Sequence, residues 1–255
     1  MPDFWFLLVA FLSRLVAGMS AALLLVSPEE AEGRFFRNKL VIMLGLLTVA
    51  LLATAAGGGR AVPLATGSTV RPGLLSAAAL AYVGSVLWML GRARWGRILL
   101  AALLLLAGYL TVVVGPAAGV GHAAWRVADP LSSALLLGAV LVAMLLGHWY
   151  LNAPGMSLRP IRRLVAATFG WLLMRAVVTG LAWSVVGGGS VDVPVAFHIL
   201  RWTAGLLLPL ILCVMVWWTL KVPNTQSATG ILYAMVVLVF IGELVALMLV
   251  RLPVD

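Results

Sequence analysis

Apolar residues fill eight long stretches of this sequence, and most polar residues are confined to the short segments between them. Each stretch can form a helix of about 20 residues, the length that crosses the hydrocarbon core of a bilayer. A segment in lipid must satisfy its own backbone hydrogen bonds, as an α-helix does. The sequence therefore predicts transmembrane helices over residues 4–26, 40–56, 73–90, 98–115, 131–150, 164–186, 195–220 and 228–250.

The segments between these spans are short and contain residues that favour turns. Arg71-Pro72-Gly73 is predicted to be a turn before the third span, and Asp129 is predicted to lie on the outer side, in the segment before the fifth. The first span is predicted to be a retained helix and not a cleaved signal peptide. Its N-terminal flank has Asp3 and no basic residue, and its apolar run is longer than that of a signal peptide.

The composition excludes a water-soluble fold. Of the 255 residues, 64% are hydrophobic and 10% are charged, whereas a soluble domain is about 45–50% apolar and about 25% charged. We therefore predict an all-α, polytopic integral membrane protein with a single transmembrane domain, residues 1–255. The segment after Ser27-Pro28 resembles the one after Ala153-Pro154, which suggests two four-helix halves, residues 1–127 and 128–255.

Basic residues indicate the orientation, because short loops rich in lysine and arginine stay on the cytoplasmic side. Both termini are therefore predicted to lie on the outer, periplasmic side of a bacterial plasma membrane. The net charge of +9 points to anionic lipid headgroups as partners and not to nucleic acid. The loops predicted to be cytoplasmic contain Arg34, Arg37, Lys39, Arg92, Arg94, Arg97, Arg159, Arg162, Arg163 and Lys221.

Four ionisable residues lie well inside the predicted spans, where each is costly and therefore a candidate for function. At about 1.5 Å per residue, Arg14 and Arg175 fall near the midplane, where they could converge. Arg201 and Glu243 lie about two turns from the outer ends of consecutive antiparallel helices. Their equal depth predicts an ion pair, which could serve only to hold the two helices together.

The seventh span carries the most informative pattern. His198, Arg201, Trp202 and Gly205 recur at i, i+3, i+4 and i+7, which places them on one helix face. Pro209 follows one turn later and is predicted to kink the helix and open a cavity beside Arg201. With Glu243 facing them, these side chains could bind a polar head on an apolar body.

The sequence predicts no metal site and no cofactor held by the chain itself. The histidines lie at different faces, and only His122 with His198 could supply two axial ligands to haem; His148 is expected at the inner interface. Cys213 is expected in the core. No P-loop, HExxH, GxSxG or cysteine cluster is present, and Glu243 is the one carboxylate predicted to lie inside the bundle. A self-sufficient enzyme is therefore not favoured.

These observations favour an integral membrane subunit that binds an amphiphile, such as a quinone or a lipid, near the outer leaflet. His198, Arg201 and Trp202 would contact the ligand, and Glu243 would accept or relay a proton. Electrons would have to come from other subunits, so a larger respiratory or redox complex is the expected setting.

Two alternatives remain open on the sequence. One is a secondary transporter for an anion or a proton-coupled solute, with Arg14 and Arg175 as the binding charges and Glu243 as the coupling group. The other is a structural scaffold or assembly factor, in which every buried charge is paired internally.

Overall fold

Eight helices in the described part of the chain are long and apolar enough to cross a membrane, which confirms the predicted all-α polytopic fold. The computed structural model describes residues 4–57, 64–115, 123–152, 155–186, 195–222 and 224–249. Seven spans are single helices: α1 Phe4–Leu24, α2 Gly33–Gly57, α3 Leu64–Met89, α4 Ala93–Val114, α5 Ala123–Asn152, α6 Arg159–Val186 and α9 Thr225–Leu249. The seventh span consists of α7 Val195–Trp202, the π-helix η2 Thr203–Leu207 and α8 Leu208–Thr219.

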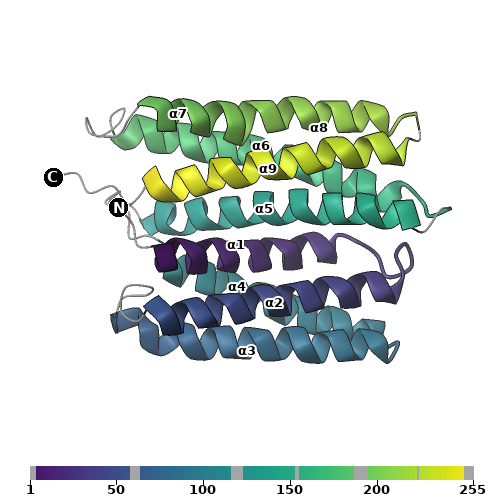
Figure 1. Ribbon diagram of the computed structural model, residues 1–255, viewed down its shortest axis with the longest axis horizontal. Helices are drawn as coiled ribbons and strands as arrows, with labels where there is room; N and C mark the ends of the chain where they lie inside the picture. The colour runs from purple at the N-terminus through teal and green to yellow at the C-terminus, as the bar shows by residue number, and fades with distance from the viewer. Residues whose placement is uncertain are drawn as a thin grey trace.

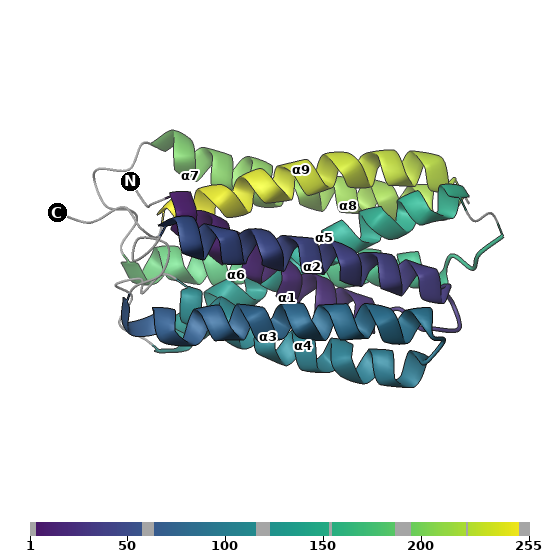
Figure 2. The same cartoon turned by 60° about the horizontal axis from the view of Figure 1, so that its bottom comes forward.

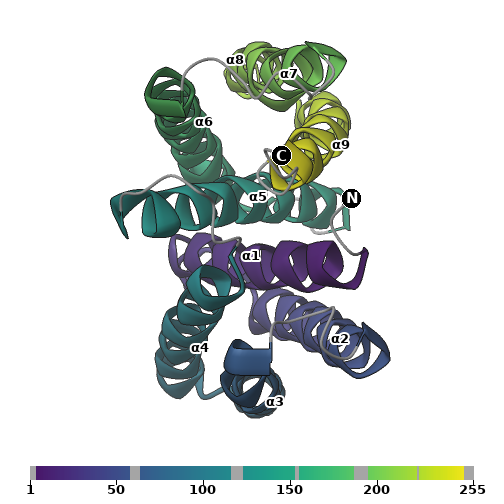
Figure 3. The ribbon, with the colours of Figure 1, turned by 90° about the vertical axis from the view of Figure 1, so that its left-hand side faces the viewer.

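The helices run along the long axis of the molecule, and α1 begins at the same end at which α9 finishes (Figures 1 and 2). Seen end-on, α1 and α5 lie side by side at the centre (Figure 3). Helices α2, α3 and α4 lie on the side of α1 that faces away from α5, and α6 to α9 lie on the side of α5 that faces away from α1 (Figure 3). The described helices are thus arranged as two groups around a central pair. An internal duplication, which the sequence suggests, remains a prediction.

Two glycines bring the backbones of the central helices into contact. A Cβ atom built on Gly18 of α1 would lie 1.7 Å from the carbonyl oxygen of Ala134, and one built on Gly138 of α5 would lie 1.8 Å from the carbonyl carbon of Gly18. No side chain fits in that space. Small residues allow close helix packing in membranes, where lipid provides little hydrophobic drive for association. The two groups of helices are therefore joined most tightly at Gly18 and Gly138.

Two helices continue through a proline near which the sequence predicted that the span begins. Pro72 lies inside α3, and Pro130 lies inside α5, so the turn at Arg71-Pro72-Gly73 and the non-helical segment before residue 131 were wrong. A proline removes one backbone hydrogen bond from a helix but does not end it when the neighbouring helices support the chain. As a result, Asp129 belongs to the bundle.

At the end of the bundle where α1 and α8 finish, basic residues cap the C-termini of these helices. Arg97 and Arg163 donate to the carbonyl oxygens of Leu24 and Leu25, at 3.2 and 2.7 Å, where α1 ends. Arg162 donates in the same way to Leu220, just after α8, at 2.7 Å. The last carbonyls of a helix lack partners within it and carry a partial negative charge. These arginines therefore tie the ends of α1 and α8 to other spans.

Candidate functional site

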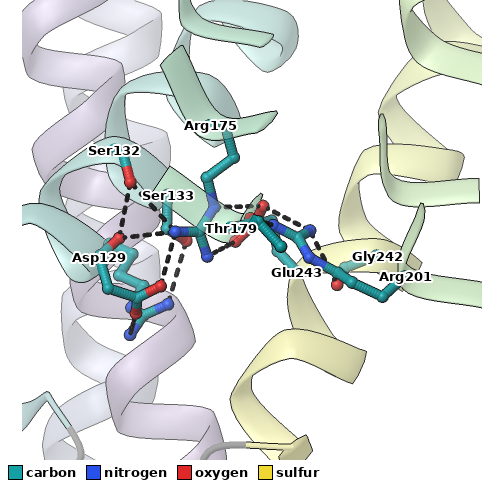
Figure 4. Close-up of polar contacts among 9 residues, drawn as sticks. Asp129, Ser132, Ser133, Arg175, Thr179, Arg201, Gly242 and Glu243 are labelled. Atoms are coloured by element: carbon teal, nitrogen blue, oxygen red, sulfur yellow. Dashed lines mark hydrogen bonds and ion pairs between the residues drawn. The ribbon is translucent and has the colours of Figure 1, made fainter. Parts of the chain in front are cut away.

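Five ionisable side chains from five helices meet in the half of the bundle that contains the start of α1. They are Arg14 of α1, Asp129 of α5, Arg175 of α6, Arg201 of α7 and Glu243 of α9. We call this set the charge cluster. Figure 4 shows its central part, in which arginines and carboxylates alternate from Asp129 to Arg201. Each ion is therefore placed beside an opposite charge, as a buried ion requires.

Arg175 is the centre of the charge cluster. Its Nε and Nη2 atoms donate to the two carboxylate oxygens of Glu243 at 3.0 and 2.9 Å. Its Nη1 atom donates to the Asp129 carboxylate at 2.6 Å and to the Ser132 hydroxyl at 3.0 Å. The fork with Glu243 is the bidentate geometry that makes arginine–carboxylate pairs strong. One arginine thus links two carboxylates, from α5 and α9, inside the membrane.

The predicted pair of Arg201 and Glu243 is confirmed. Arg201 Nη1 lies 2.9 Å from a Glu243 carboxylate oxygen and 3.2 Å from the carbonyl oxygen of Gly242. Arg201 Nη2 donates to the Thr179 hydroxyl of α6 at 3.1 Å. Both ions are buried. Arg201 therefore connects α7 to α9 on one side and to α6 on the other.

A close backbone contact makes room for this pair. A Cβ atom on Gly242 would lie 2.1 Å from the Cα atom of Gly205, and one on Gly205 would lie 3.0 Å from Arg201 Nη1. Gly205 belongs to η2, in which the N–H of Leu208 donates to the carbonyl of Thr203, five residues back. The kink at Pro209 and the cavity beside Arg201 remain predictions. A π-helix precedes the proline, and Gly205 and Gly242 let α9 approach Arg201.

Asp129 is the member of the charge cluster that the sequence analysis placed outside the helices. It lies inside α5, contacts Arg175 at 2.6 Å and Arg14 at 3.4 Å, and its side chain is 31% exposed. Two carboxylates, not one, therefore lie in the bundle. The spacing of Asp129, Ser132 and Ser133, at i, i+3 and i+4, was the available signal, because it places three polar groups on one helix face.

Arg14 and Arg175 do converge, since both contact Asp129. Arg14 is less well paired than Arg175. It has Ser133 at 3.1 Å and Asp129 at 3.4 Å, and within the described part of the chain its buried Nε atom has no hydrogen-bond partner. The charge cluster contains three guanidinium groups and two carboxylates. Its net charge is therefore +1 when all five groups are ionised.

His198 and Trp202 lie beside the charge cluster and not in it. The His198 ring meets the Trp183 ring of α6 edge to face at 4.7 Å. A Cβ atom on Gly180 would lie 3.7 Å from Trp202. Close backbone approaches of α6 are mainly to α5 and α8 and not to α7. Helices α6 and α7 therefore meet mainly through side chains. We call this contact the α6–α7 seam and define it by Thr179, Gly180, Trp183, His198, Arg201 and Trp202.

The remaining candidates lie elsewhere. His122 is outside the described residues, so the haem hypothesis stays untested. His148 is within 3.4 Å of the Tyr233 hydroxyl, and the Cys213 thiol is buried and lies 3.5 Å from the Val165 carbonyl. Among the residues that the structure describes, no group of three histidine, cysteine or acidic side chains could hold a metal ion.

The charge cluster and the α6–α7 seam together offer guanidinium donors next to aromatic rings in an apolar setting. Guanidinium groups bind carboxylates, phosphates and carbonyl oxygens most strongly where water is scarce. No protein-family model, curated protein or solved structure matches the chain.

Proposed function

We propose that this chain is an integral membrane subunit that binds an amphiphile, a quinone or a lipid, in the α6–α7 seam. The observation that carries the proposal is the order of side chains along the seam. Trp183 and His198 lie nearest the helix ends, and Thr179, Arg201 and Trp202 follow one turn deeper. Such a seam presents a hydrogen-bonding centre between aromatic surfaces, which suits a polar head on an apolar body.

The seam is accessible from the lipid side. Trp183 is 40% exposed and Trp202 is 37% exposed, whereas Arg201 between them is buried. An amphiphile that enters between the two tryptophans would reach the Arg201–Thr179 hydrogen bond first. A head-group carbonyl or phosphate oxygen could accept from either donor. Since Glu243 already accepts from Arg201 Nη1, its role in this proposal is to orient the guanidinium group, in place of the proton relay expected at first.

The orientation of the chain belongs to the same proposal. Ten lysines and arginines lie at or near the end of the bundle where α1 finishes, and we infer that this end faces the cytoplasm. The seam would then lie in the outer leaflet, on the periplasmic side in a bacterium. A quinone bound there would exchange electrons with a partner subunit of a larger redox complex, the setting that the sequence analysis favours.

Two seam variants test the proposal. In Thr179→Val and Trp202→Leu proteins, purified in mild detergent, the amount of co-purifying quinone or lipid is expected to fall about tenfold, the effect of losing one good contact of about 1.4 kcal/mol. Mass spectrometry of the extracted ligands measures it.

The matched control is Trp218→Leu, which removes an exposed tryptophan from the other end of the seventh span. Its bound amphiphile should equal that of the wild type. Equal retention in the seam variants would contradict the proposal. Wild-type protein that purifies with no stoichiometric amphiphile would favour a scaffold.

A further inference from the structure

Beyond the α6–α7 seam, we infer that the charge cluster binds a small monovalent anion at Arg14. The site is at the other end of the cluster, between α1 and α5, and needs no seam ligand. Three observations carry it: the pairing of Arg14, the net charge of the cluster and the exposure of Asp129.

The pairing of the three arginines is unequal. Arg175 makes close contacts from all three of its nitrogens, and Arg201 has partners at 2.9 and 3.1 Å. Arg14 is 1% exposed, yet its only carboxylate contact is 3.4 Å long and its Nε is without a partner among the described residues. A buried charged donor left unsatisfied costs more than a hydrogen bond gains, so such a group usually marks an unseen water or ion.

The net charge of the cluster indicates which kind of ligand would pair with Arg14. Asp129 is held by Arg175 at 2.6 Å and is therefore not free to move fully onto Arg14. The cluster of three guanidinium groups and two carboxylates lacks one negative charge. A neutral water would satisfy the Nε–H group but would leave the charge, which is expensive at this depth in a membrane. One monovalent anion satisfies both.

Asp129 provides the route to the site. Its side chain is 31% exposed, while the side chains of Arg14, Arg175, Arg201 and Glu243 are nearly inaccessible. An ion that passes Asp129 would reach Arg14, whose Nη2 atom contacts Asp129 at 3.4 Å and whose Nη1 atom donates to the Ser133 hydroxyl at 3.1 Å. A buried position reached past one carboxylate favours a small ion, such as chloride or formate, over a phospholipid headgroup.

The test compares thermal stability in detergent at constant ionic strength, with gluconate replaced stepwise by chloride. For the wild type we expect the thermal midpoint to be about 3–6 °C higher at a chloride concentration of ten times the dissociation constant than without chloride. Arg14→Gln should abolish this dependence, because it removes both the charge and the donors. The control Arg126→Gln makes the same change at an exposed position of α5 and should retain it.

A direct measurement of chloride binding to the wild type tests the anion site even if the Arg14→Gln protein does not fold. Equilibrium dialysis of the wild type with radioactive chloride should give one saturable ion per chain. Chloride dependence that survives in Arg14→Gln, or the absence of saturable chloride in the wild type, would overturn the assignment. So would stabilisation by phosphatidylglycerol in nanodiscs without any response to chloride, since the anion would then be a lipid headgroup.

Discussion

Replacing Glu243 by glutamine is expected to destabilise the folded bundle by about 3–5 kcal/mol, the usual effect of removing one member of a buried ion pair. The reason is that Glu243 accepts from Arg175 twice and from Arg201 once. Glutamine has nearly the same shape but no charge, so both guanidinium groups would lose their common partner. The measurement is the thermal midpoint of the purified protein, together with its level in membranes.

The control for this change is Glu30→Gln, which alters an ion pair with Arg163 at the membrane surface. The Arg163 side chain is 47% exposed, and surface ion pairs contribute about 0–1 kcal/mol. If Glu243→Gln is as stable as Glu30→Gln, the charge cluster does not hold α6, α7 and α9 together. The double variant Glu243→Gln with Arg201→Met should recover part of the loss, because it removes Arg201, the arginine left without a carboxylate, whereas Arg175 keeps Asp129.

A methyl group added at Gly18 is expected to have the second-largest effect. In Gly18→Ala the new Cβ atom would lie 1.7 Å from the Ala134 carbonyl oxygen, and no rotamer change can relieve a clash with backbone. Helices α1 and α5 would have to move apart, which costs about 3 kcal/mol or more, the upper range for overpacking. A lower thermal midpoint and faster proteolysis of detergent-purified protein would report this separation.

Two other glycines provide the comparison. Gly45 in α2 and Gly170 in α6 have nothing within 4 Å of a built Cβ atom. Alanine at either position should be neutral or should stabilise its helix by about 0.5–1 kcal/mol, because alanine has the better helix propensity. A Gly18→Ala protein that behaves like these two would show that the central helices are not in tight contact.

Much of the fold could be predicted because the thickness of the hydrocarbon core sets the length of each transmembrane helix. Eight apolar stretches gave eight membrane-spanning helices. The pair of Arg201 and Glu243 was also predictable, because equal depth on consecutive antiparallel helices leaves few other partners. These successes depend on local pattern and on neighbours in the chain.

The parts that failed depend on contacts between distant segments. Asp129 precedes a proline, and a local pattern cannot show that the surrounding helices keep α5 intact through Pro130. The π-helix of the seventh span also lacks a local signature, since it accompanies the contact of Gly205 with Gly242. His198 and Trp202 were correctly placed near Arg201, but sequence periodicity could not show that they pack against α6.

The pairing of Arg14 with Asp129 also constrains how the protein is made. The two residues are 115 positions apart, and ribosomes add about 5–20 residues per second. For roughly 6–23 s after its synthesis, the first helix therefore carries an arginine whose acidic partner has not yet been translated. During that interval α1 must stay near water, near lipid headgroups or within the insertion machinery. The ion pair between Arg14 and Asp129 can form only after α5 has been inserted.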